Sequence, residues 1–158
     1  MTQNQFDTIP SVEVEVTNAR DFLSDPETLG LVERYREECA KPPFDDSVPD
    51  LRAYEAMETV GAYGIAVLKK DGKAIGFVGV TVYTTPHFSL PVASIESIFL
   101  DIEHRKGANG LRLINWAKWF ARGKGAVGLT FTAVEGTRLE RLALRIARKT
   151  SHNFFMEV

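Results

Sequence analysis

Residues 103–114 read EHRKGANGLRLI, a basic, glycine-punctuated turn that runs directly into an apolar stretch. The first turn of a helix carries unpaired N–H groups and the positive end of the helix dipole. Small residues at that point let an anion approach the backbone, and Arg105 and Lys106 add positive charge beside it. The pattern predicts either an anion site or a glycine-rich turn that binds nothing. The turn fits neither a P-loop, GxxxxGK[ST], nor the dinucleotide fingerprint GxGxxG.

A carboxylate lies upstream of this turn, in a predicted strand over residues 92–101. The period of two in a strand predicts that Ser94, Glu96, Ile98 and Leu100 share one face. Apolar neighbours such as Ile98 would desolvate Glu96 and raise the pKa of its carboxyl, which suits a general base. The alternative is a glutamate in a salt bridge at the edge of the sheet.

Two other side chains could take part in chemistry. His87, in the loop TTPHFSLP, is a second candidate base because imidazole titrates near neutral pH, and the alternative is a histidine in a surface loop. Cys39 is the one cysteine, which excludes an internal disulfide. We expect it to be a small core residue rather than a nucleophile.

The elements that position these residues alternate between strand and helix patterns. Alternating valines predict a strand over residues 11–17, and Asp-Gly between apolar runs predicts a hairpin of residues 63–69 and 74–84. Helices are predicted from Pro26 to about Cys39, over residues 50–60 with Asp50 as N-cap, and over residues 109–122. Thr137 and Glu140 form a capping box that starts a last helix. Short strands at residues 127–133 and 152–158 complete a single α/β domain around a mixed sheet.

Composition and charge restrict the class of protein. The chain has 158 residues, 44% apolar and 25% charged, which predicts one globular domain after a flexible N-terminus at residues 1–10. No apolar run could span a membrane and no secretory signal is visible, so we expect a cytoplasmic protein. Residues 104–150 hold eleven Lys and Arg against two acidic residues. This basic half predicts an anionic ligand, or else solvated basic helix faces such as the one formed by Arg138, Arg141, Arg145 and Arg148.

The turn after the predicted strand at residues 92–101 resembles the coenzyme-binding motif of the GNAT superfamily of acyl-CoA-dependent N-acyltransferases, [R/Q]-x-x-[G/A]-x-[G/A]. The matching residues are Arg105, Lys106, Gly107, Ala108, Asn109 and Gly110. Alanine stands at the fourth position, where glycine is usual, and the first glycine is displaced by one residue. The element order extends the resemblance from about residue 12 to the C-terminus. NGLRLI, with TTPH upstream and GTRL downstream, looks most like small members encoded by tailed phages.

The resemblance implies an α/β (α+β) fold with a mixed, mostly antiparallel sheet and helices on both faces. It also implies direct transfer of an acetyl group from acetyl-CoA to an amine, in a ternary complex and without a metal. The diphosphate of coenzyme A would bind at the turn and at Leu111. The pantetheine arm would pair with the backbone of Ile98, Phe99 and Leu100, and Glu96 would act as the general base, often through a water.

One departure from the family concerns the leaving thiolate. Many relatives carry a tyrosine in the last helix that protonates it, but residues 142–144 read LAL here. Tyr83, Tyr63 or a water could take this role, or the step needs no acid.

Two further functions compete with the transferase. The first is a GNAT-fold protein with weak or no catalysis that binds a partner, and the second is nucleic-acid binding through the basic half. The pI of about 5.9 and the lack of a recognisable module oppose the second. The acidic N-terminal half favours a cationic acceptor, namely a lysine, a polyamine or a protein N-terminus. A host protein and a homodimer are further options for partners.

Overall fold

The computed structural model describes residues 11–39, 48–150 and 156. The predictions of a flexible tail at residues 1–10 and of a final strand at residues 152–158 lie outside these residues, except for Met156. Within the described part of the chain, no helix is both long and apolar enough to cross a membrane.

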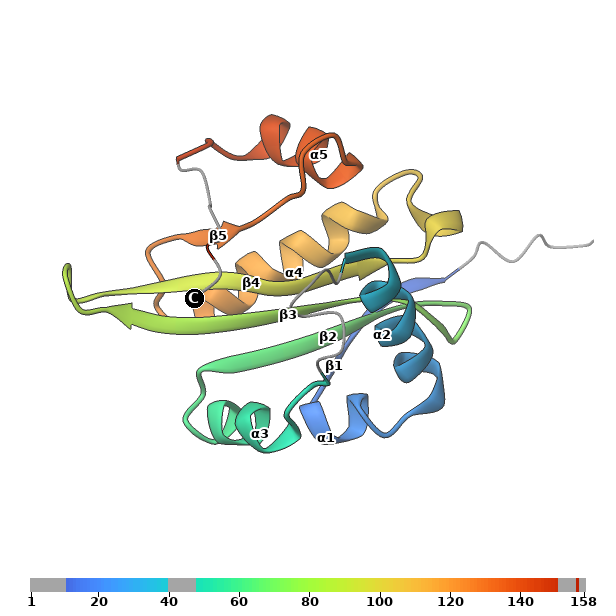
Figure 1. Ribbon diagram of the computed structural model, residues 1–158, viewed down its shortest axis with the longest axis horizontal. Coiled ribbons are helices and arrows are strands. Elements are labelled where there is room, and N and C mark those ends of the chain that lie inside the picture. The colour runs from blue at the N-terminus through green and yellow to red at the C-terminus, as the bar shows by residue number, and fades with distance from the viewer. Residues whose placement is uncertain (1–10, 40–47, 151–155, 157–158) are drawn as a thin grey trace, which may run out of the picture.

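Five strands form one sheet in sequence order, as Figure 1 shows. The first four pair as antiparallel neighbours, and the fifth pairs parallel to the fourth. The strands are β1 (Val12–Thr17), β2 (Tyr63–Lys70), β3 (Lys73–Thr85), β4 (Leu90–Leu100) and β5 (Leu129–Phe131). The predicted mixed, mostly antiparallel sheet is confirmed.

Helices cover both faces of the sheet (Figure 1). They are α1 (Ala19–Phe22), α2 (Pro26–Cys39), α3 (Leu51–Thr59), the 3-10 helix η1 (Ile102–His104), α4 (Asn109–Gly123) and α5 (Arg138–Ile146). Helix α4 packs its apolar side on one face through Leu113, Ile114 and Ala117. Helices α1, α2 and α3 pack on the other face, around Phe77 and Phe99. Helix α5 lies beyond β5 at the edge of the molecule.

Several local signals in the sequence specify what the structure shows. Asp50 caps α3 by accepting hydrogen bonds from the backbone N–H groups of Arg52 and Ala53. Asp71 and Gly72 both have positive φ, as the tight hairpin between β2 and β3 requires. Thr137 caps α5 as predicted.

Other boundaries differ from the predictions. The hairpin of β3 and β4 is longer than expected, so the predicted loop around His87 shrinks to a turn at residues 86–89. Strand β5 has three residues instead of seven, and α1, with four residues, was not predicted. Segments this short contain too few residues to show a period.

A β-bulge in β4 changes the sheet at Glu96. Gly79 of β3 lies opposite Ser97, but the next residue, Val80, lies opposite Ile95. Glu96 is therefore an extra residue without a partner on β3. On the other side, β5 pairs with β4 only as far as Ile95. From Glu96 to the end of β4, no strand among the described residues pairs with the edge that faces β5, and we call this the open edge of β4.

Gly64 lets α4 approach the sheet closely, because a Cβ atom there would lie 2.4 Å from the Phe120 ring. We expect Gly64→Ala to lower the free energy of unfolding by about 1–3 kcal/mol, since an overpacked core must shift. Gly128→Ala is the matched control because a Cβ there meets nothing within 4 Å, and it should stay within about 0.5 kcal/mol of the original protein. Urea unfolding followed by tryptophan fluorescence measures both values, and equal stabilities would contradict this packing.

Candidate functional site

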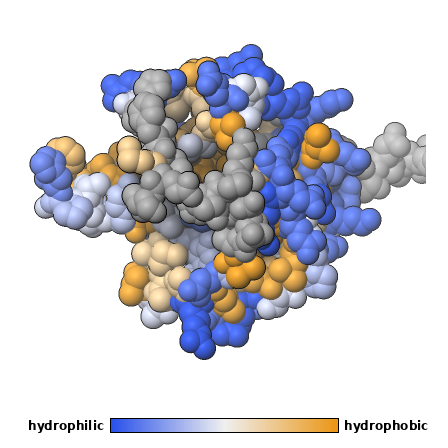
Figure 2. All heavy atoms as spheres, viewed as in Figure 1, coloured by the Kyte–Doolittle hydropathy of each residue, from blue (hydrophilic) through white to orange (hydrophobic). Residues whose placement is uncertain are grey.

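A cleft of about 810 Å³ opens where β4 and β5 diverge. Its walls are the second half of β4, the end of α2, the amino end of α4 and one side of α5. Figure 2 shows a hollow beneath α5 with hydrophobic side chains inside it and hydrophilic side chains over α5 above it. Of the residues predicted to bind the coenzyme, all line this cleft except Lys106 and Asn109.

The open edge of β4 presents backbone groups to the cleft. The N–H of Asp101 donates to the carbonyl of Ile75, so Asp101 faces β3. The N–H and C=O groups of successive residues point to opposite sides of a strand. Those of Phe99 therefore also point to β3, whereas those of Ile98 and Leu100 point to the cleft. The carbonyl of Leu100 already accepts a hydrogen bond from Arg105 Nε at 2.7 Å. Ile98 therefore offers the donor and acceptor pair that an extended ligand could use in the way a strand would.

The amino end of α4 offers a second set of donors. Gly107 has a φ of 75° and borders the cleft, and the cap residue Ala108 makes no side-chain hydrogen bond to the helix. The first N–H groups of a helix have no acceptor within it, so those of Gly110 and Leu111 can bind an anion. Asn109 holds the turn instead, because its Nδ2 donates to the carbonyl of His104 at 3.1 Å.

Arg105 is held by the protein itself. Its guanidinium forms an ion pair with Glu38 of α2 and lies 5.4 Å from the centre of the Phe99 ring. The hydrogen bonds that the guanidinium donates to Glu38 raise the pKa of Arg105. Arg34 adds a bidentate pair with Asp101, at 2.7 and 3.0 Å. These two ion pairs connect α2 to the end of β4, so the guanidinium of Arg105, which lines the cleft, is paired with a carboxylate in this structure.

Helix α5 brings further positive charge to the cleft. Arg138, Arg141 and Arg145 line the cleft. Arg138 donates to the carbonyl of Arg105, and Arg141 donates to the carbonyl of Gly136, each at 3.1 Å. The sequence left open whether this basic stripe binds an anion or faces solvent. The structure places three of its four arginines on the cleft, where an anion would meet them.

Glu96 lies among tyrosines on the opposite face of β4 from Ile98 and Leu100. Its Oε1 accepts a hydrogen bond from Tyr54 Oη at 3.0 Å, whereas Ile98 and Leu100 pack in the cluster beneath α4. The prediction that Glu96 shares a face with these two residues is therefore wrong, because the bulge adds one residue and inverts the alternation. Glu96 is also exposed rather than desolvated by its apolar neighbours.

Three polar groups converge over Gly79, opposite this bulge. A Cβ atom on Gly79 would lie 2.6 Å from Tyr63 Oη, 2.8 Å from Ser97 Oγ and 3.3 Å from Glu96 Oε2. Because Gly79 has no side chain, the carboxylate of Glu96 and the phenol of Tyr63 can occupy the space above it. Tyr54 stacks beside Tyr63, with ring centres 4.8 Å apart.

The tyrosines near Glu96 keep their protons. Burial first, and then the charge of Glu96, raise the pKa of Tyr54 and of Tyr63 well above the ordinary value. Burial, Cys39 and Glu96 together raise the pKa of Tyr35 to about 12. At neutral pH the cluster therefore consists of neutral phenols around one carboxylate.

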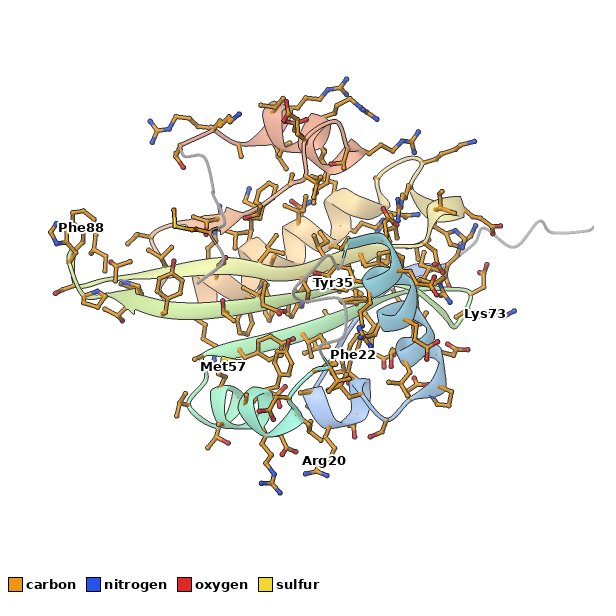
Figure 3. All side chains as sticks on the ribbon, in the orientation of Figure 1. Arg20, Phe22, Tyr35, Met57, Lys73 and Phe88 are labelled. Atoms are coloured by element: carbon orange, nitrogen blue, oxygen red, sulfur yellow. The ribbon has the colours of Figure 1, made fainter. Side chains whose placement is uncertain are left out.

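His87 and Tyr83 are not brought to this cluster. His87 lies at the exposed tip of the β3–β4 hairpin and packs against Phe88, which Figure 3 shows at the far end of the molecule. Val80 lies five residues before the end of β3 at Thr85, which is roughly 17 Å along a strand, and His87 lies beyond that end. Tyr83 is half exposed on β3 and pairs with Val92, also away from Glu96.

Sequence reasoning missed Tyr35 and Tyr54 as site residues. Tyr35 comes from α2 and lines the cleft, and Figure 3 shows it over the sheet. Glycine within a strand, as at Gly79, was the available signal of a bulge or a close approach.

The expectation that Cys39 is a core residue was wrong, because its thiol is exposed at the end of α2 and lines the cleft. Among the described residues, no group of three metal-ligating side chains comes together.

Solved structures share this fold at low sequence identity. A ribosomal-protein-alanine N-acetyltransferase from Brucella melitensis biovar Abortus 2308 is 19% identical, with a TM-score of 0.68 over 94% of this chain and 99% of the other. An aminoglycoside N-acetyltransferase, AAC(6')-Iy, in complex with CoA is 20% identical, with a TM-score of 0.73 over 96% of this chain and 97% of the other. An aminoglycoside acetyltransferase from an uncultured soil metagenomic sample, in complex with sisomicin, is 17% identical, with a TM-score of 0.70 over 93% and 96%.

The sequence itself was compared with curated proteins and with family models. No curated protein matches it. The model of the acetyltransferase (GNAT) family matches residues 30–151, which include most of α2, the sheet from β2 onward, the cleft and α5. The open β4 edge, the glycine turn and the start of α4 all lie inside the matched region. The chain therefore belongs to the acetyltransferase (GNAT) family.

Proposed function

We propose that the chain transfers an acetyl group from acetyl-CoA to a primary amine, with Glu96 as the general base. The observation that carries the proposal is that Glu96 stands at the bulge, where the open edge of β4 begins, and borders the cleft. Glu96 would take a proton from the amine, directly or through a water. The amine nitrogen would then bond to the acetyl carbon as the carbon–sulfur bond breaks and the thiolate leaves.

The cleft fits the chemistry of coenzyme A. Pantetheine carries amide groups, and the backbone of Ile98 is free to pair with them on the open edge of β4. A diphosphate matches the N–H groups at the start of α4, next to Gly107. Arg145 on the same cleft supports binding of a further phosphate, so the donor would be held largely by backbone groups and the basic side of α5.

The leaving thiolate has no tyrosine of α5 to protonate it. Tyr35 is the tyrosine that lines the cleft. Burial, Cys39 and Glu96 raise the pKa of Tyr35 to about 12, so its phenol is a weaker acid than a thiol of ordinary pKa, about 8.5. We therefore propose that the thiolate leaves without a proton from the protein and is protonated by equilibration with the buffered solvent afterwards, and that Tyr35 donates at most a hydrogen bond to it.

The finer predictions from sequence remain predictions. These are the likeness to phage-encoded members, the host-protein partner and the homodimer. The binding-only alternative predicts no thiol release with any amine, which separates it from the transferase.

Binding of acetyl-CoA should depend on Gly110. A Cβ atom there meets nothing closer than Leu142 at 3.8 Å, so Gly110→Leu keeps the fold but fills the cleft at the start of α4. We expect acetyl-CoA to bind at least tenfold more weakly, measured by isothermal titration calorimetry. Gly123→Leu, at the other end of α4 with nothing within 4 Å, is the matched control and should bind as the original protein does. Equal affinities in both variants would place the diphosphate elsewhere.

Turnover should depend on the carboxylate of Glu96. Glu96→Gln keeps the shape of the side chain but cannot accept a proton, so we expect thiol release with an amine panel to fall by about 10²–10⁴-fold. Acetyl-CoA should bind within about threefold of the original affinity, because its expected contacts are elsewhere in the cleft. Glu33→Gln, on the exposed side of α2, is the control and should keep full turnover. Unchanged turnover in Glu96→Gln would remove Glu96 as the base.

A further inference from the structure

We propose that a second, smaller cavity beside Glu96 selects an acceptor with a primary ammonium on a short, unbranched alkyl chain. This inference rests on the proposed transferase function and names the class of its acceptor. It concerns the aromatic cavity between the sheet and helices α1, α2 and α3, which is distinct from the large cleft and which none of the sequence motifs indicated.

Aromatic rings and aliphatic side chains form most of the walls of this cavity. Phe22 of α1, Tyr35 of α2, Tyr54 of α3, and Tyr63 and Phe77 of the sheet line it. Figure 3 shows Phe22 and Tyr35 on neighbouring helices over the same face of the sheet. The rings pack edge to face, with the centres of Phe22 and Phe77 5.1 Å apart and those of Tyr35 and Phe77 5.7 Å apart. Aromatic faces attract a cation and also pack against alkyl carbon.

The charge of the cavity is negative. Glu96 is the one charged side chain among the described residues that line it, and no lysine or arginine of that part of the chain does so. The surrounding phenols stay neutral, because burial and Glu96 raise the pKa of Tyr54 and Tyr63. A cation inside would therefore meet ring faces and one carboxylate, whereas an anion would find no positive partner.

The volume of the cavity limits the size of the acceptor. It is about 70 Å³, and one water-sized group needs roughly 10–15 Å³ on the same measure. The cavity thus holds about five non-hydrogen atoms, which is an ammonium and about four methylene groups. A sugar ring with its substituents does not fit.

The cavity and the cleft meet at Glu96. Tyr35, Glu96 and Ser97 line both of them, so the two spaces share a boundary at the bulge. An ammonium in the cavity would contact the carboxylate that accepts its proton, beside the open edge of β4 where we place the donor. The products are the acetylated amine and the coenzyme thiol, and the proton leaves through Glu96 to solvent.

Wild-type protein tests this inference with three acceptors and one neutral analogue. The acceptors are 1,4-diaminobutane, a peptide with one internal lysine, and sisomicin, in which amines are carried on linked rings. We expect kcat/KM, from thiol release, to be at least tenfold higher for 1,4-diaminobutane or the lysine peptide than for sisomicin. A higher value for the diamine identifies a free amine as the source of the alkyl chain, and a higher value for the peptide identifies a protein side chain. In calorimetry with coenzyme A present, 1,4-butanediol should bind at least tenfold more weakly than 1,4-diaminobutane.

A variant with a larger side chain in the cavity tests the same inference. Val32 lines the cavity but not the cleft, so Val32→Phe should raise KM for the preferred amine at least tenfold and leave acetyl-CoA affinity within twofold. Val60→Phe makes the same change at an exposed position and should alter neither value. If Val32→Phe does not fold, the comparison of acceptors with wild-type protein still tests whether the cavity binds the acceptor.

The outcomes separate the two proposals. Failure of wild-type protein to bind acetyl-CoA overturns the transferase function and this inference with it. Normal acetyl-CoA binding with sisomicin acetylated as well as the short amines, or with Val32→Phe unchanged in KM, overturns the cavity as acceptor site and leaves the transferase standing.

Discussion

The candidate site depends on one extra residue in β4. The bulge at Glu96 ends the pairing with β5, so the rest of β4 has an open edge toward the cleft. It also inverts the alternation of the strand, which turns the Ile98 backbone to the cleft and the Glu96 side chain to the tyrosines on the other face. An acyl donor bound along the edge and an amine bound on the far face would thus meet at the same residue.

Much of the fold could be predicted from local sequence signals. Asp71 and Gly72 fix the hairpin, Asp50 and Thr137 fix the start of two helices, and small residues at 107–110 mark the turn before α4. Each of these signals acts over two to four residues, through backbone conformation or a capping hydrogen bond. Glu96 could also be named as a candidate base, because the sequence shows that it lies in the strand before the glycine turn.

What could not be predicted depends on contacts between distant parts of the chain. The face of Glu96 follows from a register shift between two strands, and nothing around residue 96 signals it except Gly79 on the facing strand. The partner of Arg105 is Glu38, 67 positions away, which connects the expected phosphate ligand to α2. The tyrosine cluster likewise joins α2, α3 and β2. Periodicity describes one element at a time, so none of these pairings was visible.

The bulge also has a consequence for how such a protein changes over generations. In the proposed site, the acyl donor is held largely by peptide N–H and C=O groups of β4 and α4, which any sequence provides as long as the backbone keeps its course, beside the arginines of α5. The aromatic cavity is made of side chains from α1, α2, α3 and the sheet, each of which a single codon change can replace. Divergence can therefore alter the molecule that receives the acetyl group while the machinery that delivers it is inherited intact.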